Sequence, residues 1–315
     1  MNRRDLLILG GGTLLATGLP AWAQGPRAMH GKAFGSAWKL VADVDALDAA
    51  ALREDIEAVV AAVDGAMSPF RAGSELSRFN RATTTGWQAL SAETCAVVTE
   101  ALRVAEATHD AFNPTLGPVT GRYGFGPIVE GASGTSQEIS VREGGVGKAR
   151  AELTLDLCGI AKGHALDRMA DACMARGVTD FLLELGGEVF SRGRHPAGRT
   201  WRVGVEGPSG FANALSLDGA AVATSGISVN AFSHRGRRYA HIVDPETQRP
   251  ADSALFSVTV AARTAMTADA FATALFAMGA ARGPAFARES GVEALFVTDD
   301  GAMFATGGFE TRFVA

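Results

Sequence analysis

The sequence contains little cysteine and no excess of positive charge, and both absences narrow the range of functions. Only three of its 315 residues are cysteine, at positions 95, 158 and 173, so at least one thiol stays unpaired within a monomer. Cys95 and Cys173 lie in helix-like stretches, where we expect them to pack as small hydrophobic residues. The formal net charge of −5 argues against nucleic acid as the main partner.

Beyond the N-terminal region, the sequence also lacks an apolar run long enough to span a membrane. The N-terminal apolar stretch has the features of a targeting segment: Arg3 and Arg4 precede it, and residues 21–23 fit a small-x-small cleavage site. We therefore predict a signal peptide over residues 1–23, one domain over residues 24–315 and a soluble periplasmic protein. The paired arginine favours the twin-arginine route, and an ordinary secretion signal with incidental arginines is the alternative.

Hydrophobic residues make up 47% of the chain, enough for a large core, and their spacing predicts both helices and strands. Ser91 is placed to cap one helix and Gly177 to end another. These elements do not alternate in a regular strand–helix–strand repeat, so the predicted class is α+β. The expected helices cover residues 45–66, 91–108, 162–176 and 267–279, the expected strands 181–185, 201–205 and 256–261, and a hairpin 292–304.

Three short runs place polar groups beside glycine or alanine. They are residues 156–163, residues 223–226 followed by 239–245, and residues 268–273. Small residues let the backbone approach a ligand closely. Aspartate and threonine oxygens suit a hard cation such as Mg²⁺. Together the runs predict a metal-assisted site for a phosphate-containing ligand.

Each polar residue in these runs also has a plainer structural interpretation. Asp269 and Thr273 share one face of a predicted helix and could share a cation, but Asp269 could equally cap that helix. Asp156 and Lys162 bracket a loop that opens a helix, where phosphate can bind, or they are a capping and a surface residue. His241 could accept a hydroxyl proton or serve the structure alone. The residues by themselves leave these alternatives open.

The joint order of the runs resembles the FAD:protein FMN transferases, the ApbE family. The resemblance extends over nearly all of the chain after the signal segment. It is carried by further motifs at residues 34–36, 67–71, 74–80, 112–115, 124–127 and 185–188.

The resemblance implies an enzyme that transfers FMN from FAD to a threonine hydroxyl of an acceptor flavoprotein, with Mg²⁺ bound and AMP released. It places the catalytic base at His241. It places Mg²⁺ at Asp269, at Thr273 and at the backbone carbonyl of Gly159. It places the flavin nucleotide at Phe34, Phe70, Ala111, Phe112, Asn113, Asp156, Lys162 and Val243.

Four residues depart from the family pattern. Phe34 replaces a common methionine and Phe70 a common tyrosine, Asn113 replaces a frequent aspartate, and Gln248 stands where glycine is usual, so we expect that turn to differ. Two other functions remain open beside FMN transfer. One is an FAD pyrophosphatase in which water replaces the threonine, and the other is a non-catalytic flavin-binding assembly factor.

Overall fold

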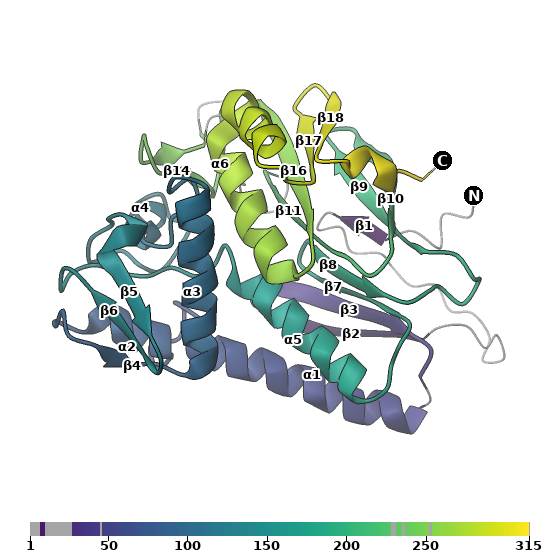
Figure 1. Ribbon diagram of the computed structural model, residues 1–315, viewed down its shortest axis with the longest axis horizontal. Coiled ribbons are helices and arrows are strands. Elements are labelled where there is room, and N and C mark those ends of the chain that lie inside the picture. Colours follow the sequence, from purple (N-terminus) through teal and green to yellow (C-terminus); the bar gives the residue numbers. More distant parts are fainter. Residues whose placement is uncertain are drawn as a thin grey trace.

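The computed structural model describes residues 7–9, 27–44, 46–227, 231–234, 237–251 and 254–314. Its centre is an eight-stranded sheet in the order β18-β17-β16-β11-β8-β7-β3-β2, in which every neighbouring pair is antiparallel (Figure 1). Its strands are β2 (Arg27–Ala33), β3 (Ser36–Ala42), β7 (Phe181–Leu185), β8 (Glu188–Arg192), β11 (Ala221–Gly226), β16 (Leu255–Ala262), β17 (Ala294–Thr298) and β18 (Met303–Thr306).

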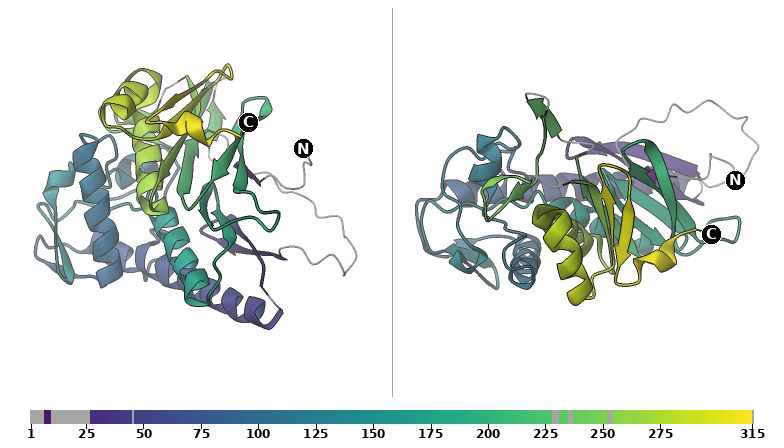
Figure 2. Two further views of the ribbon diagram at one scale, coloured as in Figure 1. Left: turned by 45° about the vertical axis from the view of Figure 1, so that its right-hand side comes forward. Right: turned by 90° about the horizontal axis from the view of Figure 1, so that it is seen from above.

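The large sheet has a core on each face because its side chains alternate. Leu183 and Leu185 of β7 pack on the side of α1 (Ala46–Met67) and α5 (Ala161–Ala175), whereas Leu182 packs on the opposite side. That opposite side is covered by a small sheet of β1 (Leu7–Leu9), β9 (Trp201–Gly207) and β10 (Gly210–Leu217). Figure 2 shows β9 and β10 across the sheet from α6 (Ala265–Glu289).

A smaller unit stands beside the large sheet and is joined to it through α3, which packs against α6 (Figure 1). This unit contains α2 (Glu75–Arg81), β4 (Gln88–Ala89), α3 (Ala92–Ala107), α4 (Gly117–Arg122), the 3₁₀ helix η2 (Ser136–Glu138), β5 (Ile139–Arg142) and β6 (Gly145–Lys148). The remaining elements are the short strands β12 (Ala231–His234), β13 (Arg237–Ala240), β14 (Val243–Asp244) and β15 (Arg249–Pro250), and the 3₁₀ helix η3 (Phe309–Arg312).

The predicted α+β class is confirmed, as are most of the predicted elements. Ser91 caps α3 by accepting a hydrogen bond from the Thr94 amide, and Gly177 follows α5 with φ +75°. The predicted last helix is interrupted at residue 279 as expected, because Gly279 adopts a non-helical φ of 75° and ψ of −178°. A second helical segment, which was not predicted, follows this kink and continues α6 to Glu289.

Two smaller expectations are also settled by the structure. Cys95 and Cys173 are buried as predicted, whereas Cys158 is exposed. In the part of the chain that the structure describes, no helix combines the length and the apolar character that crossing a bilayer requires.

Replacing Glu184 of β7 with glutamine is expected to stabilise the protein relative to wild type, and more so as the pH rises from about 5 to about 8. The pKa of Glu184 is raised to about 7, mainly by burial; Lys39 opposes the rise and Glu188 adds to it. Between its unfolded and folded pKa values the folded state binds more protons, so wild-type stability falls with rising pH. The variant escapes this loss, which we expect to reach about 1–3 kcal/mol. Urea denaturation at both pH values measures the free energy of unfolding of each protein. A difference between variant and wild type that does not change with pH would contradict the prediction.

Candidate active site

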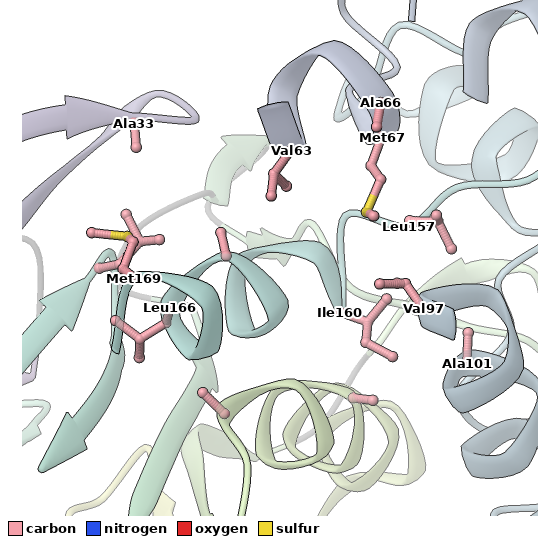
Figure 3. Packing of buried hydrophobic residues seen from close by; sticks show 14 of the residues in the cluster. Ala33, Val63, Ala66, Met67, Val97, Ala101, Leu157, Ile160, Leu166 and Met169 are labelled. Carbon is pink, nitrogen blue, oxygen red and sulfur yellow. The ribbon is translucent and has the colours of Figure 1, made fainter. Parts of the chain in front are cut away.

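The loop that leads into α5 is anchored in the core. Leu157 and Ile160 are fully buried. Figure 3 shows them among Met67 of α1 and Val97 and Ala101 of α3. The buried side chains of Leu157 and Ile160 thus anchor both ends of this short loop. Residues 158 and 159, between them, are held beside the N-terminus of α5.

Asp269 lies in the second turn of α6, but it does not cap that helix. Thr264 is the cap, because its side chain accepts a hydrogen bond from the Thr267 amide. The Asp269 carboxylate instead accepts a 3.0 Å hydrogen bond from the amide of Gly163, in the first turn of α5. It therefore satisfies a free amide of the neighbouring helix and joins the two helix starts. Its other oxygen, Oδ1, accepts no hydrogen bond from the described residues.

Thr273 lies one turn further along α6 and meets the loop before α5. Its hydroxyl is 3.3 Å from that of Ser225 on β11. A Cβ on Gly159 would lie 3.2 Å from the Thr273 hydroxyl oxygen and 3.2 Å from the Phe112 ring, so this loop approaches α6 closely because it carries glycine there. The structure thus brings Gly159, Asp269 and Thr273 to one place.

Lys162 forms an ion pair beside the predicted cation site. Its ammonium lies 2.8 Å from a carboxylate oxygen of Glu188, and only 2% of the Glu188 side chain is exposed. Burial alone would lower the pKa of Lys162, but the carboxylates of Glu188 and Asp269 outweigh it and raise that pKa. Lys162 is therefore a fixed positive charge rather than a proton donor or acceptor.

The Asp269 carboxyl is strongly perturbed. Burial first, and then the Glu188 carboxylate, raise the pKa of Asp269 to about 7, while Lys162 and the Gly163 amide oppose them. A divalent cation beside this carboxyl would displace its proton and stabilise the charged form.

The residues at this place fit Mg²⁺. No three histidine, cysteine, aspartate or glutamate side chains gather into a metal cluster within the described ranges. A carboxylate, a hydroxyl and a backbone carbonyl remain, which are the hard oxygen donors that Mg²⁺ uses together with water and substrate phosphate. Such a set suits a cation that fills its remaining coordination positions with water or with a phosphate ligand.

Of the residues predicted to contact flavin, Phe34 lies at the tip of the β2–β3 hairpin. Its φ of 51° is unusual for a large side chain. A Cβ on Gly186 would lie 2.8 Å from the Ser36 hydroxyl, so the hairpin tip rests on the β7–β8 turn that precedes Glu188. Phe70, by contrast, is 70% exposed after the end of α1.

Four further predicted flavin contacts have structural partners. Asn113 accepts hydrogen bonds from the amide and hydroxyl of Thr115, and its side-chain nitrogen donates to the Gly134 carbonyl. The Asp156 carboxylate accepts from the Cys158 amide at 2.9 Å, a local turn contact. Ala111 packs against the main core as a partly buried residue, and Val243 is buried beside Leu116 and Val119. A contact with flavin at these four positions stays a prediction.

His241 lies just before β14 and is partly buried, with its ring centroid 6.3 Å from that of Phe125 in an edge-on arrangement. Gln248, in the turn after β14, has a φ of 52°, the left-handed conformation that favours glycine. The Tyr123 hydroxyl donates a hydrogen bond to the backbone carbonyl of Gln248 at 3.3 Å. The replacement of glycine therefore does not abolish a left-handed turn here.

A cavity of about 620 Å³ is lined by none of the predicted site residues. Pro69 and Thr154, which form part of its wall, are one and two positions along the chain from Phe70 and Asp156.

A model of the ApbE family matches residues 34–296. The chain belongs to this family. It is 36% identical to the FAD:protein FMN transferase of Vibrio cholerae O395 over 273 residues, which are 81% of this chain and 82% of that protein. Among solved structures, the flavin transferase ApbE from Vibrio cholerae has a TM-score of 0.83 and 31% identity, covering 91% of this chain and 99% of that one. The apo flavinyl transferase ApbE of Pseudomonas stutzeri has a TM-score of 0.83 and 30% identity, covering 92% and 97%.

Sequence reasoning assigned no role to two polar residues of this ApbE-family site. Glu188 was part of a recognised motif. The sequence signal that could have identified it is a charged residue that directly follows a glycine pair, at the start of a buried strand. Ser225 was part of another run, but its contact with Thr273 depends on how β11 lies beneath α6.

Replacing Gly163 of α5 with alanine is expected to destabilise this ApbE-family protein by about 1–3 kcal/mol. The new Cβ would lie 2.3 Å from the backbone carbonyl oxygen of Ala265, which forces α5 and α6 apart. Gly65 in α1 is the matched control, because a Cβ there meets nothing within 4 Å. Gly65→Ala should stabilise the helix by about 0.5–1 kcal/mol. Thermal denaturation distinguishes the two, and equal effects would show that the helices do not meet at Gly163.

Proposed function

We propose that this ApbE-family enzyme transfers the FMN half of FAD to a threonine hydroxyl of an acceptor flavoprotein, with Mg²⁺ bound and AMP released. One observation carries the proposal: Gly159, Asp269 and Thr273 meet beside the partly buried Lys162–Glu188 ion pair. A hard-oxygen set next to a fixed positive charge suits a diphosphate. Membership of the ApbE family, and relatives named as FAD:protein FMN transferases, support FAD as the donor.

The reaction requires one bond to form and one to break. The acceptor hydroxyl oxygen attacks the phosphorus of the FMN half, the bond to the oxygen that bridges the two phosphates breaks, and AMP leaves with that oxygen. When bound, Mg²⁺ would neutralise charge on the diphosphate. His241 would take the hydroxyl proton, since an imidazole titrates near neutral pH.

The remaining residues bind and orient. Lys162, held by Glu188, would place a positive charge against the diphosphate. Desolvation and the Asp156 carboxylate raise the pKa of the Cys158 thiol above its usual value.

The deciding experiment incubates the purified protein with FAD, Mg²⁺ and candidate acceptor proteins. Intact-mass analysis of the acceptor and chromatography of AMP are the readouts. Transfer gives an acceptor heavier by FMN less water, together with an equal amount of AMP. Release of FMN and AMP without a heavier acceptor would identify a pyrophosphatase. FAD binding with neither product would identify an assembly factor.

We also propose that the protein is exported to the periplasm by the twin-arginine route. Arg3, Arg4 and the predicted cleavage region at residues 21–23 lie outside the described residues. Replacing both arginines with lysine is expected to retain the precursor in the cytoplasm, because that route requires the arginine pair. Cell fractionation and immunoblotting measure the result. Unchanged export of the double variant would instead identify an ordinary secretion signal.

A further inference from the structure

Glu188 carries a buried carboxylate oxygen that has no partner among the described residues. The residue is 1% exposed. Its Oε1 accepts a hydrogen bond from the Lys162 ammonium at 2.8 Å, whereas Oε2 is buried and accepts none. A buried charged oxygen without a hydrogen bond is costly, so its retention indicates a partner that is bound during function.

The strand register places Glu188 on the side of the sheet that faces the predicted cation site. Glu188 is the first residue of β8 and lies opposite Ala223 of β11. Ser225 is two positions further along β11, hence on the same face, and its hydroxyl reaches Thr273 of α6.

The same geometry argues against Glu188 as a direct ligand of the cation. One of its oxygens is bound to the Lys162 ammonium. Mg²⁺ commonly keeps several of its waters in a protein site. A carboxylate that lies just beyond the ligands is placed to accept a hydrogen bond from one of those waters.

We propose that Glu188 is a positioning residue that orders both charges of the site. Its Oε2 accepts a hydrogen bond from a water on the divalent cation that Asp269 and Thr273 hold, and its Oε1 fixes Lys162. The inference rests on the proposed cation site, and it adds a residue that tunes cation affinity without touching the cation. A single side chain then sets the distance between the cation and the ammonium that flank the diphosphate.

The test measures Mn²⁺ affinity by electron paramagnetic resonance on the signal-free protein, without FAD or acceptor. Glu188→Gln keeps the shape, but either orientation of its amide turns an NH₂ group toward one of the two partners. The expected loss in Mn²⁺ affinity is about 10- to 100-fold, as for partners just beyond other metal ligands. Glu184→Gln is the matched control, because it removes a nearby carboxylate that no hydrogen bond joins to Lys162. The Mn²⁺ affinity of the Glu184→Gln control should stay within about threefold of wild type, a smaller change than the loss expected for Glu188→Gln.

Urea denaturation in EDTA, run on the same variants, separates positioning from folding. A purely structural role would lower metal-free stability and leave the Mn²⁺ affinity of the folded protein unchanged. If Glu188→Gln does not fold, Glu188→Asp replaces it, because it keeps the charge but withdraws the carboxylate by one methylene and should weaken Mn²⁺ binding as well. Wild-type Mn²⁺ affinity in the folded variant overturns the inference. A wild type that binds Mn²⁺ but transfers no FMN overturns the proposed function alone, and one that binds no Mn²⁺ overturns both.

Discussion

Replacing His241 with alanine is expected to lower the rate of FMN transfer by about two to four orders of magnitude, the usual contribution of a positioned general base. The histidine is partly buried beside Phe125, and an imidazole can accept a hydroxyl proton. FAD affinity should stay near that of wild type, because the fixed charge and the oxygen donors belong to α5, β8 and α6. Single-turnover transfer assays and FAD fluorescence titration measure the two quantities separately.

His195 provides the matched control for this prediction. It is also partly buried and lies edge-on to an aromatic ring, with its centroid 5.2 Å from that of Trp201, the first residue of β9. His195→Ala should therefore reproduce the loss of an aromatic contact without any loss of transfer. Equal transfer by wild type and His241→Ala would remove His241 from the chemistry. A parallel loss of FAD affinity would make it a binding residue instead.

Replacing Asp269 with asparagine or alanine is expected to lower Mg²⁺-dependent FAD turnover by about a hundredfold or more, because the cation contributes several kcal/mol to charge stabilisation. Asparagine retains an oxygen that can accept from the Gly163 amide, so this variant should keep more stability than the alanine variant. AMP release at increasing Mg²⁺ concentration measures the activity, and thermal denaturation measures the stability.

Asp167→Asn is the control for the structural part of this effect. Asp167 accepts hydrogen bonds from the amides of Ala265 at 2.7 Å and Met266 at 2.9 Å, so it satisfies first-turn amides of α6 much as Asp269 satisfies the Gly163 amide of α5. Burial raises the pKa of Asp167 to about 6, so its pKa, like that of Asp269, lies above the usual value. Its replacement should alter stability but spare turnover. Full turnover by Asp269→Asn would exclude Asp269 as a metal ligand.

The sequence predicted local structure better than it predicted contacts between elements. Ser91 and Gly177 mark helix ends through their own side-chain and backbone chemistry, and both marks are correct. Gly279 interrupts α6 through its positive φ, also as predicted, whereas the second helical segment that follows it was not predicted. The order of the eight strands depends on long-range pairing, which no local pattern encodes.

In the candidate site, too, local features were predictable from the sequence and contacts between elements were not. The spacing of Asp269 and Thr273 predicted that they share one helix face, and the family resemblance predicted that Gly159 lies beside them. Neither showed that Asp269 would cap a different helix, because that contact joins residues 106 positions apart. The partnership of Glu188 with Lys162 was hidden for the same reason, since it requires β8 to lie beneath the start of α5.

The hydrogen bond from the Gly163 amide to Asp269 makes one backbone proton a natural probe of the site. The chemical shift of an amide proton responds to the charge on its acceptor, and here the acceptor is the carboxylate that a cation would engage. In a ¹⁵N-labelled sample, the Gly163 resonance should therefore move once as Asp269 loses its proton near neutral pH and again as a divalent cation is added. Occupancy of the site could then be followed without a substrate, an acceptor or a chromophore.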